Sequence, residues 1–487
     1  MYIMDKNTGY KEAKAMKFKM KTKPWKHQLL ALEYLYPRDI AALYTAPGTG
    51  KTKIIIDLIV NRGWNLVLVV TTNKGCDVWE AEFRKHSNLS TKNVLNLAGI
   101  PGGKKVQLCK QKLSEGKNGY KDGPVILICN YEGVWRPEFA AYLMHKTVKI
   151  DAVVCDESHR IKSPSSRCSW FLKRIGRKVP CRYLVTGTPL AENPMDIYAQ
   201  YRFLDPSIFG TRFADFKERY QNVDTYLSQK FGYSVLKKDQ PYKNLDELHD
   251  KMFSCAFLMP SSVKLPKRFN TIKRFKLNKK CSKVYRQLQK EGAIDFGDTF
   301  IETNNALTLL TRKRQLTGGM LPVENDVGEK KIKVFSHDRM EFLAEILDGL
   351  PRDEPVVIFA QFVHDFKEIR AACKKAKRKC SELSGREDTL ADWKSGKTQV
   401  ISVQYTSGSE SVDLTRARYT IYYGLTNRLA LYEQSKKRTH RPGQTRPCYY
   451  MHFVATLDDG SSTVDQRIME AIRQKKDIVQ YCLTVGE

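Results

Sequence analysis

The segment at residues 40–56 constrains the fold more than any other part of the chain. A short apolar run at 40–44 leads into the loop T-A-P-G-T-G-K-T at 45–52, and an apolar stretch, K-I-I-I, follows it. Gly48 and Gly50 allow backbone N–H groups to turn inward around an anion. The N-terminus of the following helix adds partial positive charge. Strand, glycine loop and helix in this order predict a phosphate-binding cradle.

Two side chains of this loop can hold a nucleotide. Lys51 can reach the β and γ phosphates, and Thr52 can ligate Mg²⁺. The alternative is that the segment is a glycine-rich turn with a solvated lysine and no ligand. The predicted strand before it and helix after it disfavour this interpretation. The predicted nucleotide-binding residues of the loop are Pro47, Gly48, Thr49, Gly50, Lys51 and Thr52.

Short apolar runs of strand length recur along the chain, with helical patterns between them. In the first half they lie at 40–44, 66–70, 125–129, 152–155 and 183–186. In the second half they lie at 356–359, 399–403, 419–423 and 449–454. Because buried parallel strands are apolar on both faces, this alternation predicts an α/β fold with parallel sheets flanked by helices.

The segment between the two strand sets is mostly polar and has few strand signals. We predict a helical insertion and linker there, at 207–345. It separates a first α/β lobe at 28–206 from a second at 346–487, and a lysine-rich basic arm occupies 1–27.

The charge balance narrows the class of partner. Lysine and arginine total 83 against 53 acids, a formal charge of +30, which favours nucleic acid or an anionic membrane surface. No apolar run approaches the roughly 18 residues of a transmembrane helix. The twelve cysteines form no C-x-x-C pair, so we expect reduced thiols in a cytosolic or nuclear protein rather than a zinc ribbon.

An acidic motif follows the apolar run at 152–155. Its residues are Asp156, Glu157, Ser158 and His159, and an acid at the carboxyl end of a parallel strand lies at the ligand edge of the sheet. Asp156 can hold Mg²⁺, and Glu157 can orient and deprotonate an attacking water. The alternative is a polar helix cap, which the phosphate loop upstream makes the weaker interpretation.

Together with further motifs, these segments resemble the Swi/Snf-like branch of superfamily 2 helicases, a class of DNA-dependent ATPases, in a compact phage or bacterial form. The matching first-half motifs are P-W-K-H-Q at 24–28, V-V-T-T at 69–72, W-E-A-E-F at 79–83, N-Y-E at 130–132, D-E-S-H-R-I-K at 156–162 and L-V-T-G-T-P-L at 184–190. The matching second-half segments are R-K-R-Q at 312–315, V-I-F-A-Q-F at 357–362, residues 406–415 and Q-S-K-K-R-T-H-R-P-G-Q at 434–444. The resemblance implies two RecA-like lobes that use ATP and Mg²⁺.

The resemblance also implies a role for each matched residue. Gln28 would read adenine, and Arg441 would be an arginine finger from the second lobe. The implied catalytic residues are Lys51, Asp156, Glu157, Gln434, Arg438 and Arg441, with Thr52 and Asp156 on the metal. The implied coupling residues are His159, Thr186, Thr188 and Asp413. The implied DNA contacts are Thr72, Lys74, Tyr131, Lys162, Gln361 and Thr406.

Some positions depart from the family pattern. Ser409, Ser411 and Asp413 stand where the family has glycines and an asparagine, and M-P-S-S at 259–262 stands where it has paired arginines. Basic clusters that could contact phosphates, or equally form solvated faces, lie at 11–26, 104–105, 312–314 and 374–379. We expect Trp25, Trp79 and Trp135 to be packing residues rather than base-stacking platforms.

We therefore expect an ATP-driven translocase that moves along duplex or branched DNA, acts in the cytoplasm and has no membrane partner. One alternative is an RNA helicase or RNA–protein remodeller on the same two lobes. Another is the motor subunit of a restriction or defence complex. A scaffold that binds DNA without hydrolysing ATP is disfavoured by the intact Lys51, Asp156, Glu157 and Arg441.

Overall fold

The computed structural model describes residues 18–46, 48–114, 123–259, 265–297, 299–303, 305–325, 328–407 and 412–484. The chain forms two compact units. Unit 1 holds Met1–Lys264 and Asp477–Glu487, and unit 2 holds Leu265–Lys476. Because the chain divides at 264/265, the segment predicted as an insertion is shared between the two units.

Unit 1 is built on a seven-stranded parallel sheet in the order β3-β4-β2-β5-β6-β1-β9. Its strands are β1 (Ile40–Thr45), β2 (Leu66–Thr71), β3 (Val94–Asn96), β4 (Val125–Asn130), β5 (Ala152–Asp156), β6 (Cys181–Thr186) and β9 (Ala256–Met259). The five strands predicted here are confirmed. The two that sequence patterns missed, β3 and β9, are the short edge strands.

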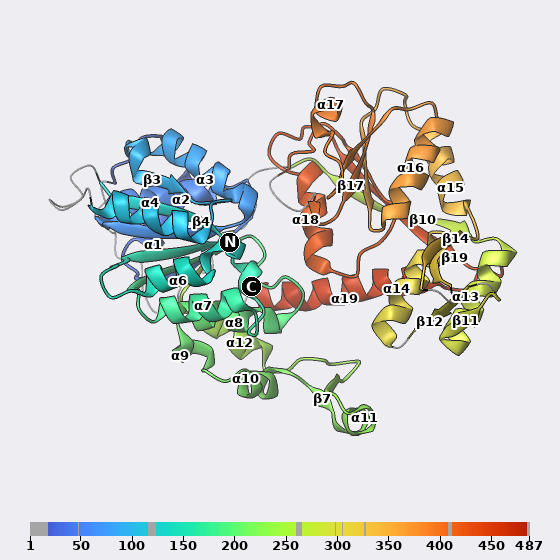
Figure 1. The fold of residues 1–487 in the computed structure, drawn as a ribbon, viewed down its shortest axis with the longest axis horizontal. Helices are drawn as coiled ribbons and strands as arrows, with labels where there is room; N and C mark the ends of the chain where they lie inside the picture. Colours follow the sequence, from blue (N-terminus) through green and yellow to red (C-terminus); the bar gives the residue numbers. More distant parts are fainter. Residues whose placement is uncertain are drawn as a thin grey trace. The chain divides into compact units, whose positions relative to one another are not determined.

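Unit 1 has helices on both faces of this sheet (Figure 1). The helices of unit 1 are α1 (Lys26–Leu35), α2 (Lys51–Arg62), α3 (Asn73–His86), α4 (Gly102–Ser114), α5 (Tyr131–Val134), α6 (Pro137–Met144), α7 (Arg167–Gly176), α8 (Ile197–Leu204), α9 (Pro206–Phe209), α10 (Phe213–Tyr220), α11 (Thr225–Phe231) and α12 (Leu245–Phe253). A two-stranded hairpin, β7 (Val223–Asp224) with β8 (Val235–Leu236), lies beside α11 and projects away from the sheet (Figure 1).

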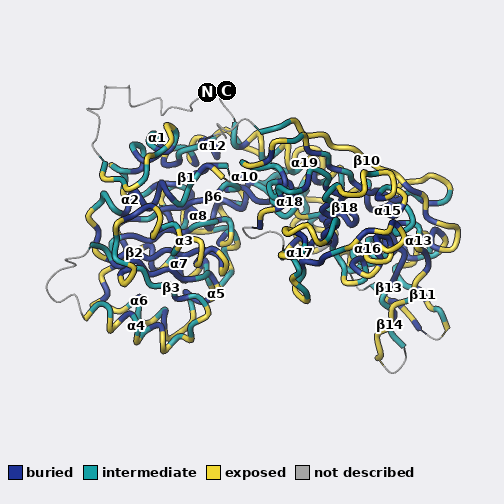
Figure 2. The backbone as a smooth tube through the Cα atoms, turned by 90° about the horizontal axis from the view of Figure 1, so that it is seen from above, coloured by how far each residue is buried: buried dark blue, intermediate teal, exposed yellow. Residues whose placement is uncertain are grey.

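Both faces of the unit 1 sheet are buried, which explains the continuous apolar runs. Along β2, Val67 and Val69 face the core with α2 and α3, while Leu66, Leu68 and Val70 face the opposite core. Figure 2 shows β1, β2 and β6 as buried strands. A sheet covered in this way leaves its strand ends as the place for polar side chains.

Unit 2 contains a six-stranded parallel sheet in the order β10-β19-β18-β15-β17-β16. Its strands are β10 (Arg268–Lys276), β15 (Val356–Ala360), β16 (Cys380–Leu383), β17 (Val400–Gln404), β18 (Tyr419–Tyr422) and β19 (Cys448–Thr456). The four strands predicted for the second half are confirmed, and the fold class of two α/β lobes with parallel sheets is borne out.

The predicted insertion at 207–345 is helical only in part. It contributes the edge strands β9 and β10 to the two parallel sheets. It also forms an antiparallel sheet of β11 (Ala293–Asp295), β12 (Phe300–Glu302), β13 (Met320–Glu324) and β14 (Lys330–Val334). The edge strand β14 lacks an apolar run because it is exposed: only one residue of K-K-I-K-V is even partly buried.

The helices of unit 2 are α13 (Lys279–Glu291), α14 (Ala306–Thr317), α15 (Asp338–Asp348), α16 (Val363–Lys375), α17 (Leu390–Lys394) and α18 (Leu429–Thr439). The last helix, α19 (Val464–Thr484), begins in unit 2 and ends in unit 1, where Cys482 is fully buried.

Two expectations from composition are met. All twelve cysteines are free thiols, and most are buried, as expected for small core residues. Among the described helices, none is long and apolar enough to cross a membrane.

Candidate active site

The predicted phosphate cradle lies between β1 and α2 in unit 1. Gly48 and Gly50 both adopt the left-handed conformation, with φ of 83° and 79°. At Gly50 a side chain is excluded twice over, because an added Cβ would also lie 2.2 Å from Nε2 of Gln28. The loop can therefore turn tightly into α2, whose N-terminus is a ready anion site. Pro47 lies outside the described residues.

Gln28 is tied to this loop by its side-chain amide. Its Nε2 donates to the carbonyl of Thr49 at 3.0 Å, and its Oε1 accepts from the backbone N–H of Trp25 at 2.9 Å. The His27 ring also contacts the Thr49 carbonyl, at 3.1 Å. Gln28 is buried and fixes the approach of α1 to the loop. Its predicted role in reading adenine stays a prediction.

Lys51 and Glu157 meet at the carboxyl edge of the sheet. The Lys51 Nζ lies 3.2 Å from Oε1 of Glu157, and the lysine side chain is only 11% exposed. Partial burial would raise the pKa of Glu157, but the Lys51 ammonium and the His159 ring outweigh it and hold that pKa well below its usual value. Glu157 has a left-handed backbone, with φ of 51°, a conformation uncommon outside glycine. This arrangement supplies an ionised carboxylate beside the cradle.

Asp156 is the neighbouring carboxylate, and it is firmly held. Its Oδ2 accepts from the Thr71 hydroxyl at 3.0 Å and from the Trp79 indole N–H at 2.8 Å. Burial and the negative charge of Glu157 raise the pKa of Asp156. Within the described part of the chain, no hydrogen bond ends on Oδ1, so this oxygen could accept a contact from a cation.

The donors at this edge fit Mg²⁺. The Thr52 hydroxyl and the Asp156 carboxylate are hard oxygen ligands, and Mg²⁺ is usually held by one or two protein oxygens together with substrate phosphates and water. The described residues contain no cluster of three or more histidines, cysteines or acids that could cage a metal. The chain thus offers a site for a metal that arrives with a phosphate.

The predicted coupling residues of unit 1 lie together. Nδ1 of His159 is 3.2 Å from the hydroxyl of Thr186 and 3.4 Å from that of Thr188. The Thr186 hydroxyl also donates to Oε2 of Glu157 at 3.3 Å. The motif at the end of β6 is therefore connected by hydrogen bonds to Glu157, the carboxylate predicted to be catalytic.

The residues of unit 1 predicted to contact DNA differ in how exposed they are and in which partners they already have. Thr72 caps α3 by accepting from the N–H of Gly75 at 3.1 Å, while Lys74 is exposed. Lys162 pairs with Asp196 at 3.3 Å. Tyr131 is a correction: its side chain is buried and its hydroxyl donates to the Asp156 carbonyl at 2.6 Å, so it lies inside the protein rather than at a surface.

Unit 2 carries the remaining predicted residues. Gln361 follows β15, and Thr406 follows the adjacent parallel strand β17. Gln434 and Arg438 lie four residues apart on α18, and Arg441 follows the helix. Ser409 and Ser411 lie outside the described residues.

Asp413 and Gln444 shape the loops around α18. Burial of Asp413 is outweighed by two hydrogen bonds from Thr415 and by the charge of Arg441, which lower the pKa of Asp413. The amide of Gln444 donates to three backbone carbonyls, at 3.0 to 3.2 Å. The glutamine that ends the motif is therefore a structural anchor.

Family comparison decides the identity of this arrangement. The SNF2-related domain family matches residues 3–320, and the helicase conserved C-terminal domain family matches residues 338–443. This chain belongs to the SNF2-related family. The resemblance inferred from its motifs is confirmed.

Several known proteins resemble the chain at low identity. It is 22% identical over 433 residues to the DNA repair and recombination protein RDH54 of Saccharomyces cerevisiae, covering 84% of this chain and 45% of RDH54. It is 21% identical to putative protein p41 of Acyrthosiphon pisum secondary endosymbiont phage 1, covering 94% of this chain and 98% of p41. The SWI2/SNF2 ATPase core of Sulfolobus solfataricus, solved with dsDNA, has 17% identity and a TM-score of 0.40, and covers 97% of this chain and 96% of that one. The chain thus spans less than half the length of RDH54.

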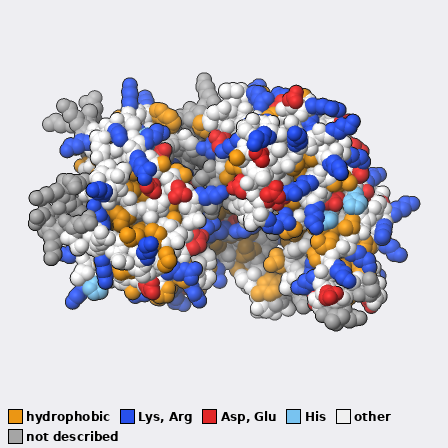
Figure 3. Space-filling view, turned by 45° about the horizontal axis from the view of Figure 1, so that its top comes forward, with side chains coloured by type: hydrophobic (Ala, Val, Ile, Leu, Met, Phe, Trp, Pro, Cys, Tyr) orange, Lys and Arg blue, Asp and Glu red, His pale blue; other side chains and the backbone are white. Residues whose placement is uncertain are grey.

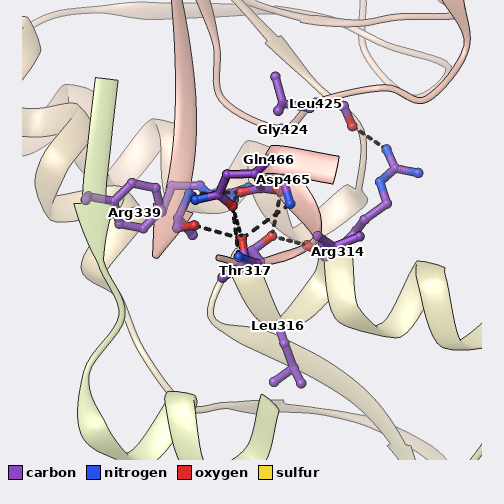
Figure 4. A network of polar contacts seen from close by, with 12 residues as sticks. Arg314, Leu316, Thr317, Arg339, Gly424, Leu425, Asp465 and Gln466 are labelled. Atoms are coloured by element: carbon purple, nitrogen blue, oxygen red, sulfur yellow. Dashed lines mark hydrogen bonds and ion pairs between the residues drawn. The ribbon is translucent and has the colours of Figure 1, made fainter. Parts of the chain in front are cut away.

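A second polar network of this SNF2-related chain holds unit 2 together (Figure 4). Asp465 accepts from Arg339 at 2.7 Å, from the Thr317 hydroxyl at 3.2 Å and from the backbone N–H of Ala455 at 3.1 Å. Arg314 donates to the carbonyl of Leu425. Helix α14, which carries the motif at 312–315, is thereby bonded to α19 through Thr317 and to the loop after β18 through Arg314, a role that sequence patterns did not reveal.

The basic residues of the SNF2-related chain are only partly available to a ligand. Figure 3 shows Lys and Arg side chains spread over the visible face. Within the predicted clusters, Lys105 and Lys313 are buried. The Lys21 ammonium donates to two carbonyls at the end of α3, and Arg378 donates to carbonyls of the 347–354 turn. Much of the charge at these positions therefore has a structural function.

Of the three tryptophans expected to pack, Trp79 and Trp135 do and Trp25 does not. Trp25 is 53% exposed, which contradicts a packing role. Trp135 packs against the core of unit 1, and the Arg136 and Arg167 guanidinium groups both contact its ring. Trp79 is buried, as expected, but its indole N–H also reaches Asp156. The pattern W-E-A-E-F at 79–83 carries no signal for that contact, because the partner is 77 residues away.

Proposed function

We propose that this SNF2-related chain hydrolyses ATP with Mg²⁺ and uses the energy to move along duplex or branched DNA, remodelling DNA or DNA–protein complexes in the cytoplasm. One observation carries the proposal. The lysine of a glycine loop lies 3.2 Å from Glu157, the carboxylate next to the metal-binding Asp156. Phosphate cradle, metal ligand and general base thus share one sheet edge, which is the arrangement phosphoryl transfer requires.

The residues suggest how the site responds to ATP. Lys51 would exchange the Glu157 carboxylate for the β and γ phosphates, which releases Glu157 to orient a water and accept its proton. The low pKa of Glu157 keeps the carboxylate ionised before that exchange. Thr52 and Asp156 would hold Mg²⁺, which when bound neutralises charge developing on the phosphates. Arg441 would stabilise the transition state as an arginine finger.

Duplex DNA is the nucleic acid along which we propose that the protein moves. RDH54, a relative over most of this chain, is named as a DNA repair and recombination protein. The formal charge of +30 suits a polyanion. Predicted contacts follow the carboxyl ends of β2 and β5 in unit 1 and of β15 and β17 in unit 2, so they gather at the same edge of each sheet as the nucleotide motifs. Fork processing, branch migration and repair are the processes we propose for such movement.

A triplex-displacement assay tests movement directly. A third strand bound to a duplex is released only when a protein travels through the site. We expect displacement that requires ATP and is absent for Lys51→Ala, while this variant still binds duplex DNA. ATP-dependent displacement that persists in Lys51→Ala, or ATP turnover by the wild type with no displacement, contradicts the proposal.

A further inference from the structure

The Asp156 carboxylate is oriented by two elements other than its own strand. The Thr71 hydroxyl, at the end of β2, and the Trp79 indole N–H, on α3, both donate to Oδ2, at 3.0 and 2.8 Å. Thr71 is 0% exposed and Trp79 is 1% exposed. A buried indole N–H rarely lacks a partner, so this contact fixes the ring as well as the carboxylate.

The surroundings of Trp79 leave it little freedom. The ring lies 6.0 Å from the Phe83 ring and belongs to the core between α2, α3 and the sheet. Gly75, one turn earlier, has no room for a side chain, because an added Cβ would lie 2.4 Å from the Thr71 hydroxyl. This glycine lets α3 approach the end of β2 closely enough for Trp79 to reach Asp156. The helix geometry and the hydrogen bond therefore depend on each other.

Both bonds end on the same oxygen. Oδ2 is saturated by donors from the protein, while Oδ1 receives none from the described residues. A carboxylate held through one oxygen presents the other in a fixed direction, which is how neighbouring residues orient metal ligands. Helix α3 is capped by Thr72 and carries Lys74 in its first turn, and these two residues are predicted DNA contacts. Trp79 thus connects α3, whose first residues are predicted to contact DNA, to Asp156, the carboxylate predicted to hold the metal.

We propose that Trp79 is a positioning residue of the ATP site: its indole N–H, together with the Thr71 hydroxyl, orients Asp156 so that Oδ1 meets the Mg²⁺ that accompanies the nucleotide. This inference rests on the proposed function. A purely packing role for Trp79 predicts a different outcome, because replacement by another aromatic ring would then leave metal-dependent binding unchanged.

The test compares nucleotide affinity with and without the metal. Trp79→Phe keeps an aromatic ring but removes the N–H, and Thr71→Val keeps the shape but removes the hydroxyl. Trp64→Phe is the matched control, since Trp64 belongs to the same core but packs on Tyr183 and Arg62 instead. Binding of a fluorescent ADP is titrated in Mg²⁺ and again in EDTA, and thermal melting checks that each variant is folded.

We expect the gain in affinity that Mg²⁺ gives the wild type to fall about 10- to 100-fold in Trp79→Phe, the usual cost of losing such a neighbour of a metal ligand. Thr71→Val should also reduce the gain in nucleotide affinity from Mg²⁺, and Trp64→Phe should leave this gain unchanged. In EDTA, the nucleotide affinity of every variant should stay within about twofold of the wild type. The inference is overturned if Trp79→Phe keeps the full Mg²⁺ gain, or if it loses affinity equally in EDTA. If Trp79→Phe does not fold, Thr71→Val alone decides. A wild type that binds no nucleotide contradicts the proposed function instead.

Discussion

Lys51 and Glu157 form an ion pair, with the lysine Nζ 3.2 Å from Oε1 of the glutamate. One residue is expected to hold phosphate and the other to activate water, yet here each neutralises the other. On the proposed function, binding of a triphosphate would separate the two side chains, because the phosphates and Glu157 would compete for Lys51. Hydrolysis would then follow only after Lys51 has exchanged Glu157 for the phosphates.

Glu157→Gln tests this exchange. Removal of the general base should lower kcat by about 10²- to 10⁴-fold. Because the amide no longer competes for Lys51, affinity for ATP should stay equal or rise. Steady-state kinetics and equilibrium binding of a fluorescent ATP measure the two effects. Glu341→Gln, which alters an exposed ion pair with Lys375, is the control and should change neither. A Glu157→Gln protein that binds ATP more weakly at unchanged kcat contradicts the exchange.

Arg441→Ala tests the predicted arginine finger. In other nucleotide hydrolases such a residue contributes about 10³- to 10⁵-fold to kcat. We expect Arg441→Ala to lower kcat for ATP hydrolysis by a factor of this size. Its equilibrium affinity for nucleotide should stay close to that of the wild type. Arg352→Ala removes an exposed arginine of the same unit and should have no effect. Equal turnover in the two variants argues that Arg441 is only a surface charge.

Asp465→Asn tests the network that fixes the motif at 312–315. Arg339 and Asp465 are each 3% exposed, so the substitution leaves a buried arginine without its counter-charge. Breaking a buried pair in this way costs about 3–5 kcal/mol. Urea unfolding of unit 2 should reveal it. Asp392→Asn breaks an exposed pair with Lys397 and should cost under about 1 kcal/mol. Similar losses in both variants would mean that the buried network is not a stabilising feature.

His452 predicts a loss of stability in mild acid. Burial lowers the pKa of His452 from 6.5 to about 4. The neutral ring donates from Nδ1 to the Thr271 carbonyl and accepts at Nε2 from the Tyr432 hydroxyl. Between these two pKa values the unfolded chain binds the proton and the folded chain does not, so stability falls as pH drops from 6.5 toward 4. The loss between pH 7 and pH 5 is about 2 kcal/mol. Urea unfolding at both pH values measures it, and His452→Gln should reduce the difference. A wild type with equal stability at the two pH values contradicts this assignment.

The sequence predicted what is local and missed what depends on tertiary contacts. Interior strands such as β1 and β5 were recognised because both of their faces are buried. β10 was missed because eight of its nine residues are exposed, so R-F-N-T-I-K-R-F-K contains no apolar run. Lys51 and the Asp156–Glu157 pair were found because their chemistry lies in contiguous motifs.

Roles that rest on distant partners could not be read in advance. The bond from Trp79 to Asp156 spans 77 residues, and that from Thr317 to Asp465 spans 148. Tyr131 was assigned to a DNA surface from its motif, but its hydroxyl turns inward to the Asp156 carbonyl. Which way a side chain turns at the end of a strand depends on packing of neighbouring helices, and no local pattern encodes it.

The central claim is that ATP turnover serves movement along DNA, and its most direct test is a side-by-side comparison of nucleic acids. ATP hydrolysis is measured with duplex DNA, single-stranded DNA, forked or Holliday-like DNA and RNA at equal nucleotide concentration, with Lys51→Ala as the blank. We predict that duplex or branched DNA stimulates turnover most and that RNA stimulates it least. Maximal stimulation by RNA would contradict the account and favour an RNA helicase built on the same two units.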